Sequence, residues 1–211
     1  MFAHPIPSLL NEANQLMTPV VSEPIRPCFS RLSNIKEILS KNKELLKQCG
    51  WYYGHLSWAE SSDLLSHTTE GTFLVRDSAD SRFLYSLSIQ RKPEEGPTSV
   101  RLHFTTDGKF RLDSDERIDR LMPQFDSVLD LVQFYCQLNN RDLKFVWSDS
   151  NNKKLRHSSI SLRTPLLKKI PSLTHITRLV IWKNLKYQQE LSNLKLPKKL
   201  RNYLLEYHFF V

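Results

Sequence analysis

The sequence predicts an α+β protein in which a helix, a second helix, an antiparallel β-meander and a third helix are followed by two further helices. Three observations carry this prediction. Apolar residues recur at helical spacing near both ends of the chain, the middle of the chain has short runs of strand-forming residues, and Asp107-Gly108 is typical of a hairpin.

The first elements follow a proline-containing segment. Residues 1–31 have five prolines and no sustained periodicity, and we expect them to be disordered. A helix is predicted over residues 32–49, with an apolar stripe formed by Ile35, Ile38, Leu39, Leu45 and Leu46. Ser57 and Glu60 form a capping box, which predicts a helix over residues 58–66.

The predicted meander and its closing helix come next. Strands are expected near residues 72–77, 83–90 and 99–105, and a two-residue hairpin at Asp107-Gly108 joins the third strand to "KFRLDS". A helix fits residues 127–138, where apolar residues at i, i+3, i+4 and i+7 are Val128, Leu131, Val132 and Tyr135. We expect this domain to span residues 50–165 and to close after a polar loop, "WSDSNNKKLRHSS".

Residues 166–211 are too few for a large core of their own, yet they contain two amphipathic helices. The first is "SLTHITRLVIW". The second follows Pro197, a good first helical residue, and its apolar positions are Leu200, Tyr203, Leu204 and Tyr207. Two apolar stripes with little local core predict a binding partner.

The charge of the chain is uneven. Residues 1–140 contain 15 Lys and Arg against 18 Asp and Glu, a net charge of −3, whereas residues 141–211 contain 15 against 4, a net charge of +11. The basic half of the chain can bind nucleic acid, bind an acidic protein surface, or simply be solvated. Because its basic residues are interleaved with apolar ones at helical spacing, we favour a protein partner.

Composition limits the class of protein. Hydrophobic residues make up 40% and charged residues 25% of the 211 positions, as in soluble globular proteins. Three cysteines without metal spacing indicate reduced thiols, and neither a signal peptide nor an apolar run of membrane-spanning length is present in the sequence. We therefore expect a cytoplasmic protein without membrane insertion.

Catalysis finds no support in the sequence. Only five glycines occur, and none forms a phosphate-cradling loop. Four residues separate Cys136 from Arg141, one short of the phosphatase-type loop, and the seven histidines make no metal pattern. We expect no enzymatic activity, no metal and no cofactor.

The run "EGTFLVRDS" places an arginine near the end of a strand that should be covered on both faces. With a period of two, Thr72, Leu74 and Arg76 share one side of that strand, and Asp77 should point to the other. A buried guanidinium is costly unless an anion meets it. A lone strand arginine can also be an edge residue or an ion-pair partner, and this stretch alone leaves both readings open.

The polar neighbours of Arg76 predict an external anion. Ser78 follows the strand, Ser86 alternates with apolar residues on the next strand, and Arg101 does so on the one after. Two arginines and two hydroxyls supply donors with few acceptors. A phosphate monoester carries about −1.5 to −2 charges and three acceptor oxygens, and arginine can bind it through two parallel hydrogen bonds.

Four blocks in register resemble the Src-homology-2 (SH2) domain. They are "GWYYGHLSWAESSDLL", "EGTFLVRDSADS", "FLYSLSI" and "DGKFRLDS". The resemblance implies that Arg76 binds phosphotyrosine, with Ser78 and Ser86 as its hydroxyl partners. Leu102 stands where the family usually has a histidine, and Arg101 is similar to the second cation of one subgroup; Ala79 replaces a serine common there.

The tail resembles a suppressor-of-cytokine-signalling (SOCS) box. "PSLTHITRLVI" is similar to its elongin-binding helix, which implies elongin contacts by Leu173, Ile176, Thr177, Val180 and Ile181. "LKLP" is similar to its cullin-binding motif, which implies Leu194, Leu196 and Pro197, and "LPKKLRNYLLEYHFFV" is similar to the end of the box. The chain from about residue 32 therefore resembles a SOCS protein, nearest to the cytokine-inducible SH2-containing subgroup, with residues 166–211 as its box.

Two positions depart from the family pattern, and the two C-terminal helices also have an interpretation that requires no binding partner. Thr177 replaces a cysteine, and its hydroxyl can bond back to the carbonyl of Leu173. Lys195 replaces the first proline of the cullin motif. Without the resemblance, ordinary intramolecular packing would explain both C-terminal helices.

The predicted function is that of a non-catalytic adaptor. Its SH2 domain would capture a tyrosine-phosphorylated receptor or signalling protein, and its box would recruit elongin B/C and cullin-5 with a RING subunit, so that the captured protein is ubiquitinated. The resemblance implies negative regulation of cytokine receptor signalling through the Janus-kinase and STAT pathway. The alternatives are a module that only masks phosphotyrosine sites and a nucleic-acid binder that uses the basic tail.

Overall fold

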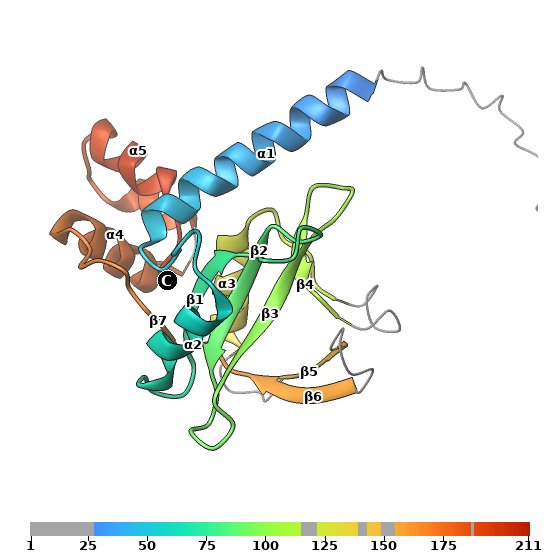
Figure 1. Cartoon of the computed structure of the whole chain (residues 1–211). Helices are drawn as coiled ribbons and strands as arrows, with labels where there is room; N and C mark the ends of the chain where they lie inside the picture. The colour runs from blue at the N-terminus through green and yellow to red at the C-terminus, as the bar shows by residue number, and fades with distance from the viewer. Residues whose placement is uncertain (1–27, 115–121, 139–142, 149–154, 187) are drawn as a thin grey trace, which may run out of the picture.

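The computed structural model describes residues 28–114, 122–138, 143–148, 155–186 and 188–211 (Figure 1). The residues 1–27 of the segment expected to be disordered lie outside this description. The N-terminal and sheet-forming elements are α1 (Cys28–Cys49), α2 (Trp58–Ser66), β1 (Thr72–Asp77), β2 (Tyr85–Gln90), β3 (Pro97–Phe104), β4 (Phe110–Leu112) and α3 (Val128–Gln137). They are followed by β5 (Leu143–Ser148), β6 (Leu155–Ile160), β7 (Thr164–Pro165), α4 (Leu173–Asn184), the 3₁₀ helix η2 (Gln188–Asn193) and α5 (Lys198–Glu206).

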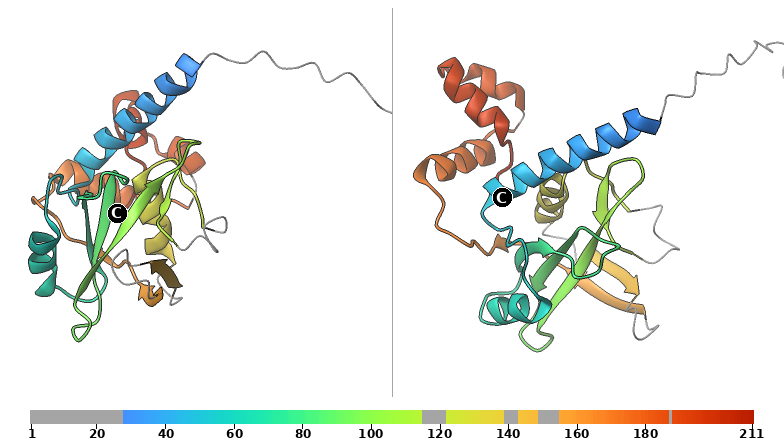
Figure 2. Two further views of the ribbon diagram at one scale, coloured as in Figure 1. Left: turned by 45° about the vertical axis from the view of Figure 1, so that its right-hand side comes forward. Right: turned by 45° about the horizontal axis from the view of Figure 1, so that its top comes forward.

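A sheet with strand order β4-β3-β2-β1-β7 forms the centre of the molecule. Strands β1 to β4 form the predicted antiparallel meander, and β7 adds to β1 in parallel, pairing Thr164 with Thr72. Figure 2 shows α2 and α3 on the two sides of this sheet. The helix, meander and helix order expected from the sequence is confirmed.

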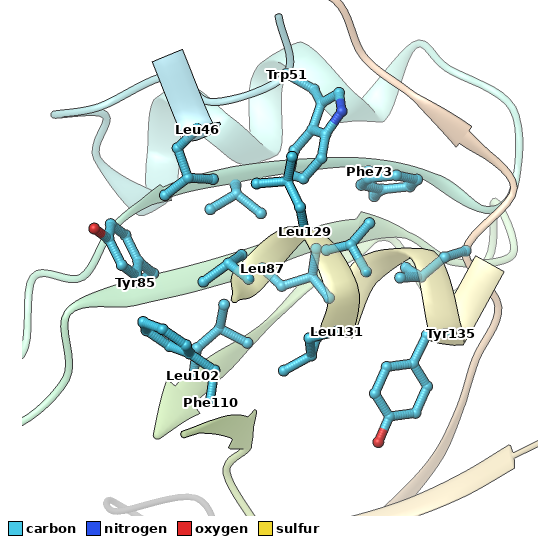
Figure 3. Close-up of a cluster of buried hydrophobic side chains, with 14 of the residues drawn as sticks. Leu46, Trp51, Phe73, Tyr85, Leu87, Leu102, Phe110, Leu129, Leu131 and Tyr135 are labelled. Carbon is cyan, nitrogen blue, oxygen red and sulfur yellow. The ribbon is translucent and has the colours of Figure 1, made fainter. Parts of the chain in front are cut away.

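The two faces of the sheet differ in polarity because side chains alternate along each strand. On the α3 face, Phe73 and Leu87 are fully buried with Leu131 of α3 (Figure 3). Val75 belongs to the same buried cluster. On the α2 face, Ser88 donates to Ser61 of α2 over 3.4 Å. Burying one large apolar side chain contributes about 1.5–3 kcal/mol, so the α3 face contributes strongly to the stability of the sheet and the helices that pack on it, the sheet domain predicted over residues 50–165.

Local capping signals place both flanking helices. The predicted capping box is present: Glu60 N donates to Ser57 Oγ, and Ser57 N donates to Glu60 Oε2. Helix α3 is capped by Ser127, and its first backbone N–H, on Val128, donates over 2.9 Å to the buried Asn42 of α1. Asn42 therefore fixes α1 against α3.

Three local predictions need correction. Helix α1 begins at Cys28, four residues before the predicted start. The turn before β4 is not a two-residue hairpin, because Gly108 N donates to Thr105 O and adopts φ +77°, which gives a longer loop with glycine in the left-handed region. The polar loop after residue 147 is interrupted by paired strands β5 and β6, because Phe145, Val146 and Trp147 favour a strand; residues 149–154 lie outside the description.

The C-terminal helical region is not separate from the sheet domain. Tyr207 and Phe209, which follow α5, are at most 1% exposed and belong to the same apolar cluster as Leu46 and Trp51. A second, small cluster centres on Trp182, Leu191 and Leu204. The predicted boundary at residue 165 therefore does not bound the core, because residues 207–211 complete it.

Arg178 joins three helices at this junction. Its guanidinium lies over the rings of Tyr203 and Tyr207, at 4.4 and 4.7 Å from their centroids. It donates to Tyr203 O, to Gln48 Oε1 of α1 and, over 2.9 Å, to His175 Nδ1. Burial and the neighbouring Arg178 lower the pKa of His175, so its neutral ring accepts this bond at pH 7.

The shared core makes a testable prediction about stability. Phe209→Ala should lower the free energy of unfolding of the whole chain by about 3–5 kcal/mol, because it leaves a cavity beside the sheet domain. The measurement is urea unfolding followed by circular dichroism. The matched control is Leu205→Ala in α5, which removes a 41% exposed side chain and should change the free energy by less than about 0.5 kcal/mol. An unfolding curve of Phe209→Ala equal to that of the unsubstituted chain would contradict the shared core.

Candidate functional site

The α2 face of the sheet carries a row of polar residues. The strand register pairs Arg76 of β1 with Ser86 of β2, and Ser86 with Arg101 of β3. Directly opposed residues share one face, so the two arginines stand on either side of Ser86, about 10 Å apart at the backbone. Arg76 and Ser86 are each 4% exposed. The structure thus brings together three of the four predicted site residues.

Within the described part of the chain, the hydrogen bonds of Arg76 are long and go to neutral acceptors. Its Nε donates to Ser88 Oγ over 3.2 Å, and its Nη2 donates to Ser99 Oγ over 3.4 Å. Its Nη1 reaches the backbone carbonyls of Asp77 and Leu56 at 3.3 and 3.5 Å. Charge-assisted bonds to an anion are usually about 2.7–2.9 Å. The guanidinium is therefore held in place without being neutralised.

Ser88 and Ser99 are site residues that the sequence prediction missed. They lie one row below Ser86 and Arg101 on the same face, and Ser88 is hydrogen-bonded to Ser99 over 2.8 Å. The signal was present, because the same alternation in "YSLSI" and "SVR" that selects Ser86 and Arg101 also selects these two hydroxyls.

The charge of Arg76 is not balanced within the described part of the chain. Burial lowers the pKa of its guanidinium, and no described Asp or Glu forms an ion pair with it. The side chain of the adjacent Asp77 is engaged elsewhere, accepting from Tyr52 Oη over 2.5 Å and lying 3.2 Å from His55 Nδ1. This agrees with the expected opposite direction of Asp77. Burying a cation without a counter-charge costs free energy, and binding of an anion offsets this cost.

The second cation, Arg101, has a different environment. Its side chain is 33% exposed and lies 3.6 Å from the carboxylate of Asp80, in the loop between β1 and β2. The guanidinium also lies over the Phe83 ring, 5.3 Å from the centroid. Ser78 begins this loop, and its Oγ accepts from Asp80 N over 3.1 Å. The predicted hydroxyl partner Ser78 is thus bonded within the loop rather than to Arg76.

Helix α4 presents most of the predicted elongin-binding residues to solvent. Leu173 is 79% exposed, Val180 54% and Ile176 41%. Thr177 is also exposed, and its hydroxyl donates to Leu173 O over 2.8 Å, as the sequence predicts. Ile181 differs, because it is half-buried against the cluster around Trp182.

The predicted cullin-binding residues are divided between core and surface. Leu194 and Leu196 pack partly against the Trp182 cluster, so they support the fold of the helical region. Pro197 is exposed, and it is the N-cap of α5 rather than the first helical residue, with φ −53° and ψ 147°. Its extended backbone ends the preceding segment before α5 starts.

Among the residues that the structure describes, no group of three or more His, Cys, Asp or Glu side chains is arranged to hold a metal ion. Within the same residues, no helix combines the length and apolar character that crossing a membrane requires.

Comparison with known proteins identifies both halves of the chain. The model of the SH2 domain matches residues 51–135, and that of the SOCS box matches residues 169–205. "Suppressor of cytokine signaling 2" from Homo sapiens is 38% identical over 173 residues, which are 82% of this chain and 82% of the relative. "Cytokine-inducible SH2-containing protein" from Gallus gallus is 32% identical over 185 residues, covering 81% and 71% respectively.

A solved SH2 domain, that of a Monosiga brevicollis CRK/CRKL homologue, is 29% identical, with a TM-score of 0.39, and covers 57% of this chain and 88% of its own. The two domain matches follow one another in the order that the sequence predicts. The full-length relatives extend across both of them at 30% identity or more. This chain therefore belongs to the suppressor of cytokine signalling family, with an SH2 domain followed by a SOCS box.

Proposed function

We propose that this chain is a non-catalytic adaptor that captures a tyrosine-phosphorylated protein and presents it to an elongin–cullin–RING ubiquitin ligase. The observation that carries the proposal is Arg76, a buried guanidinium whose described partners are all neutral. Membership of the family adds the ligase half of the proposal, because the chain contains a SOCS box.

A phosphate fits the chemistry of the Arg76 row. Its charge of about −1.5 to −2 would neutralise Arg76 and Arg101 together, and its three oxygens would accept from both guanidiniums and from Ser86. A phosphate bound above Ser86 would lie between the two arginines, because Arg76 and Arg101 are each paired with Ser86 across neighbouring strands. The ring of a phosphotyrosine would then extend from the sheet toward solvent.

The exposed side of α4 fits a partner that receives a helix in an apolar groove. Leu173, Ile176 and Val180 stand at i, i+3 and i+7 and are each more than 40% exposed. Three exposed apolar side chains on one helix face form the kind of patch that marks a protein interaction site. Elongin B/C is the proposed partner, and cullin-5 with its RING subunit would bind next to it, through the segment that ends at Pro197.

The proposed outcome is ubiquitination by proximity. The adaptor supplies no reacting group; it holds the captured protein near the ligase and so raises the local concentration of the substrate. The names of the relatives point to suppression of cytokine signalling. We place the proposed action in the cytoplasm, at a receptor of the Janus-kinase and STAT pathway.

The first test of this function is Arg76→Lys. Lysine keeps the charge but loses the two parallel bonds, so affinity for a tyrosine-phosphorylated receptor peptide should fall by a factor of about 30 to several thousand, equivalent to about 2–5 kcal/mol. Isothermal titration calorimetry measures this. The matched control is Arg91→Lys, which alters an arginine paired with Glu95 in the turn after β2 and should leave the affinity unchanged.

Two further arms separate the adaptor from the alternatives. The unphosphorylated peptide should not bind, and any binding of duplex DNA should weaken steeply with salt because it depends on counterion release. A loss of less than about threefold for Arg76→Lys, well below the range expected for a buried charge contact, would refute the phosphate pocket. Tight, sequence-selective DNA binding at physiological salt would favour the nucleic-acid alternative.

The second test concerns α4. Leu173→Ala should reduce elongin B/C affinity by a factor of about ten to 150, because burying a leucine contributes about 1.5–3 kcal/mol. Its melting temperature should hardly change, since the side chain is 79% exposed. The matched control is Leu64→Ala on α2, another exposed leucine (43%). Surface plasmon resonance with purified elongin B/C measures both.

The outcome of that experiment decides between ligase adaptor and mask. Unchanged elongin binding by Leu173→Ala, or no elongin binding by the unsubstituted chain, would contradict the ligase function and favour a module that only covers phosphotyrosine sites. A large drop in melting temperature for Leu173→Ala would indicate intramolecular packing instead.

The third test separates cullin recruitment from folding. Pro197→Ala should retain elongin B/C but lose part of the cullin-5 affinity and of substrate ubiquitination in a reconstituted reaction, because Pro197 is exposed. Leu196→Ala should in addition lower the melting temperature, because Leu196 packs against the Trp182 cluster. If Pro197→Ala leaves cullin binding and ubiquitination unchanged, Pro197 does not contact the cullin.

A further inference from the structure

The loop between β1 and β2 contains a carboxylate that the proposed phosphate site does not need. Asp80 accepts from Arg82 Nε over 3.0 Å and from Arg82 Nη2 over 2.7 Å, and its Oδ2 lies 3.6 Å from Arg101 Nη2. The Phe83 ring lies beneath both guanidiniums, at 5.6 Å from that of Arg82 and 5.3 Å from that of Arg101.

The two arginines of the proposed site therefore differ in a way that bears on binding. Arg76 has no described carboxylate partner, whereas Arg101 already faces one. Ser78 is also engaged by this loop, because its Oγ accepts from Asp80 N. Asp80 thus contacts both Arg101, the second cation of the proposed site, and Ser78, the hydroxyl residue that follows β1.

We propose that Asp80 is an internal competitor of the phosphate at Arg101 and thereby sets the affinity of the site. This proposal rests on the phosphotyrosine-binding function proposed above. A phosphate that reaches Arg101 must displace the Asp80 carboxylate or stand beside it, and like charges at such distances repel each other. Binding therefore includes the cost of breaking the contact between Asp80 and Arg101.

The electrostatics of the loop keep this competitor charged. The bonds from Arg82 lower the pKa of Asp80 to about 2, so the carboxylate is ionised at neutral pH. Its side chain is 23% exposed, and so is open to solvent as it leaves Arg101. The bidentate bond to Arg82 gives Asp80 a second partner that remains when a phosphate takes Arg101.

The test is Asp80→Asn, which keeps the size of the side chain and removes its charge. The probe is N-acetyl-phosphotyrosine amide, titrated into the full chain and followed by nuclear magnetic resonance. Affinity should rise about three- to tenfold, the scale of an exposed ion pair and a screened repulsion. The gain should shrink in 0.5 M salt, where the Debye length is only a few ångströms.

Two controls isolate the mechanism. Glu94→Gln makes the same change in net charge in the turn between β2 and β3, at the opposite end of the strands from Arg101, and should change the affinity less than twofold. In an Arg101→Gln background, Asp80→Asn should give no gain, because the competition acts through Arg101. Equal gains with and without Arg101 would overturn the proposal.

The remaining outcomes separate this inference from the function on which it rests. If Arg76→Lys abolishes binding of the probe while Asp80→Asn leaves it unchanged or weaker, Asp80 is not a competitor and the phosphate site stands. If the unsubstituted chain fails to bind the probe, or Arg76→Lys binds it equally well, both the site and the competition are overturned.

Discussion

The alternation of side chains along β1, β2 and β3 is the constraint on which the rest of the molecule depends. It places Val75 and Leu87 in the apolar core against α3, and Arg76 and Ser86 on the face covered by α2. A shift of one residue in the register would exchange the two faces and bury the guanidinium in the core. The same pattern thus stabilises the sheet and arranges its donors.

This alternation also explains how much of the site could be predicted from sequence. Arg76, Ser86 and Arg101 follow from period two and a correct strand order, and so do the missed hydroxyls Ser88 and Ser99. The ion pairs of Asp80 could not be predicted, because the loop between β1 and β2 has no periodicity. Which side chains contact one another in such a loop depends on the folded structure. The two-residue period of a strand therefore predicts on which face of the sheet a side chain lies, but not which side chains a loop residue contacts.

The fold was predictable where signals are local. The capping box of Ser57 and the stripe of α3 each lie within a few residues, and both helices form where expected. Asn42 caps α3 from 86 residues away, and Phe209 completes the core near Trp51. Both are tertiary contacts, which no local sequence pattern predicts. The apolar run after α5 was predicted to end the SOCS box, and only packing shows that it also belongs to the SH2 core.

That shared core has a consequence for how such chains are built. Recombination exchanges domains most easily where few contacts cross a boundary, and here the boundary is crossed by Tyr207, by Phe209 and by the guanidinium of Arg178 bonded to Gln48. A chimera of this SH2 domain with a foreign box would have to supply an aromatic pair at the same depth and a cation for α1. Exchange of either half would therefore leave the other with an incomplete core.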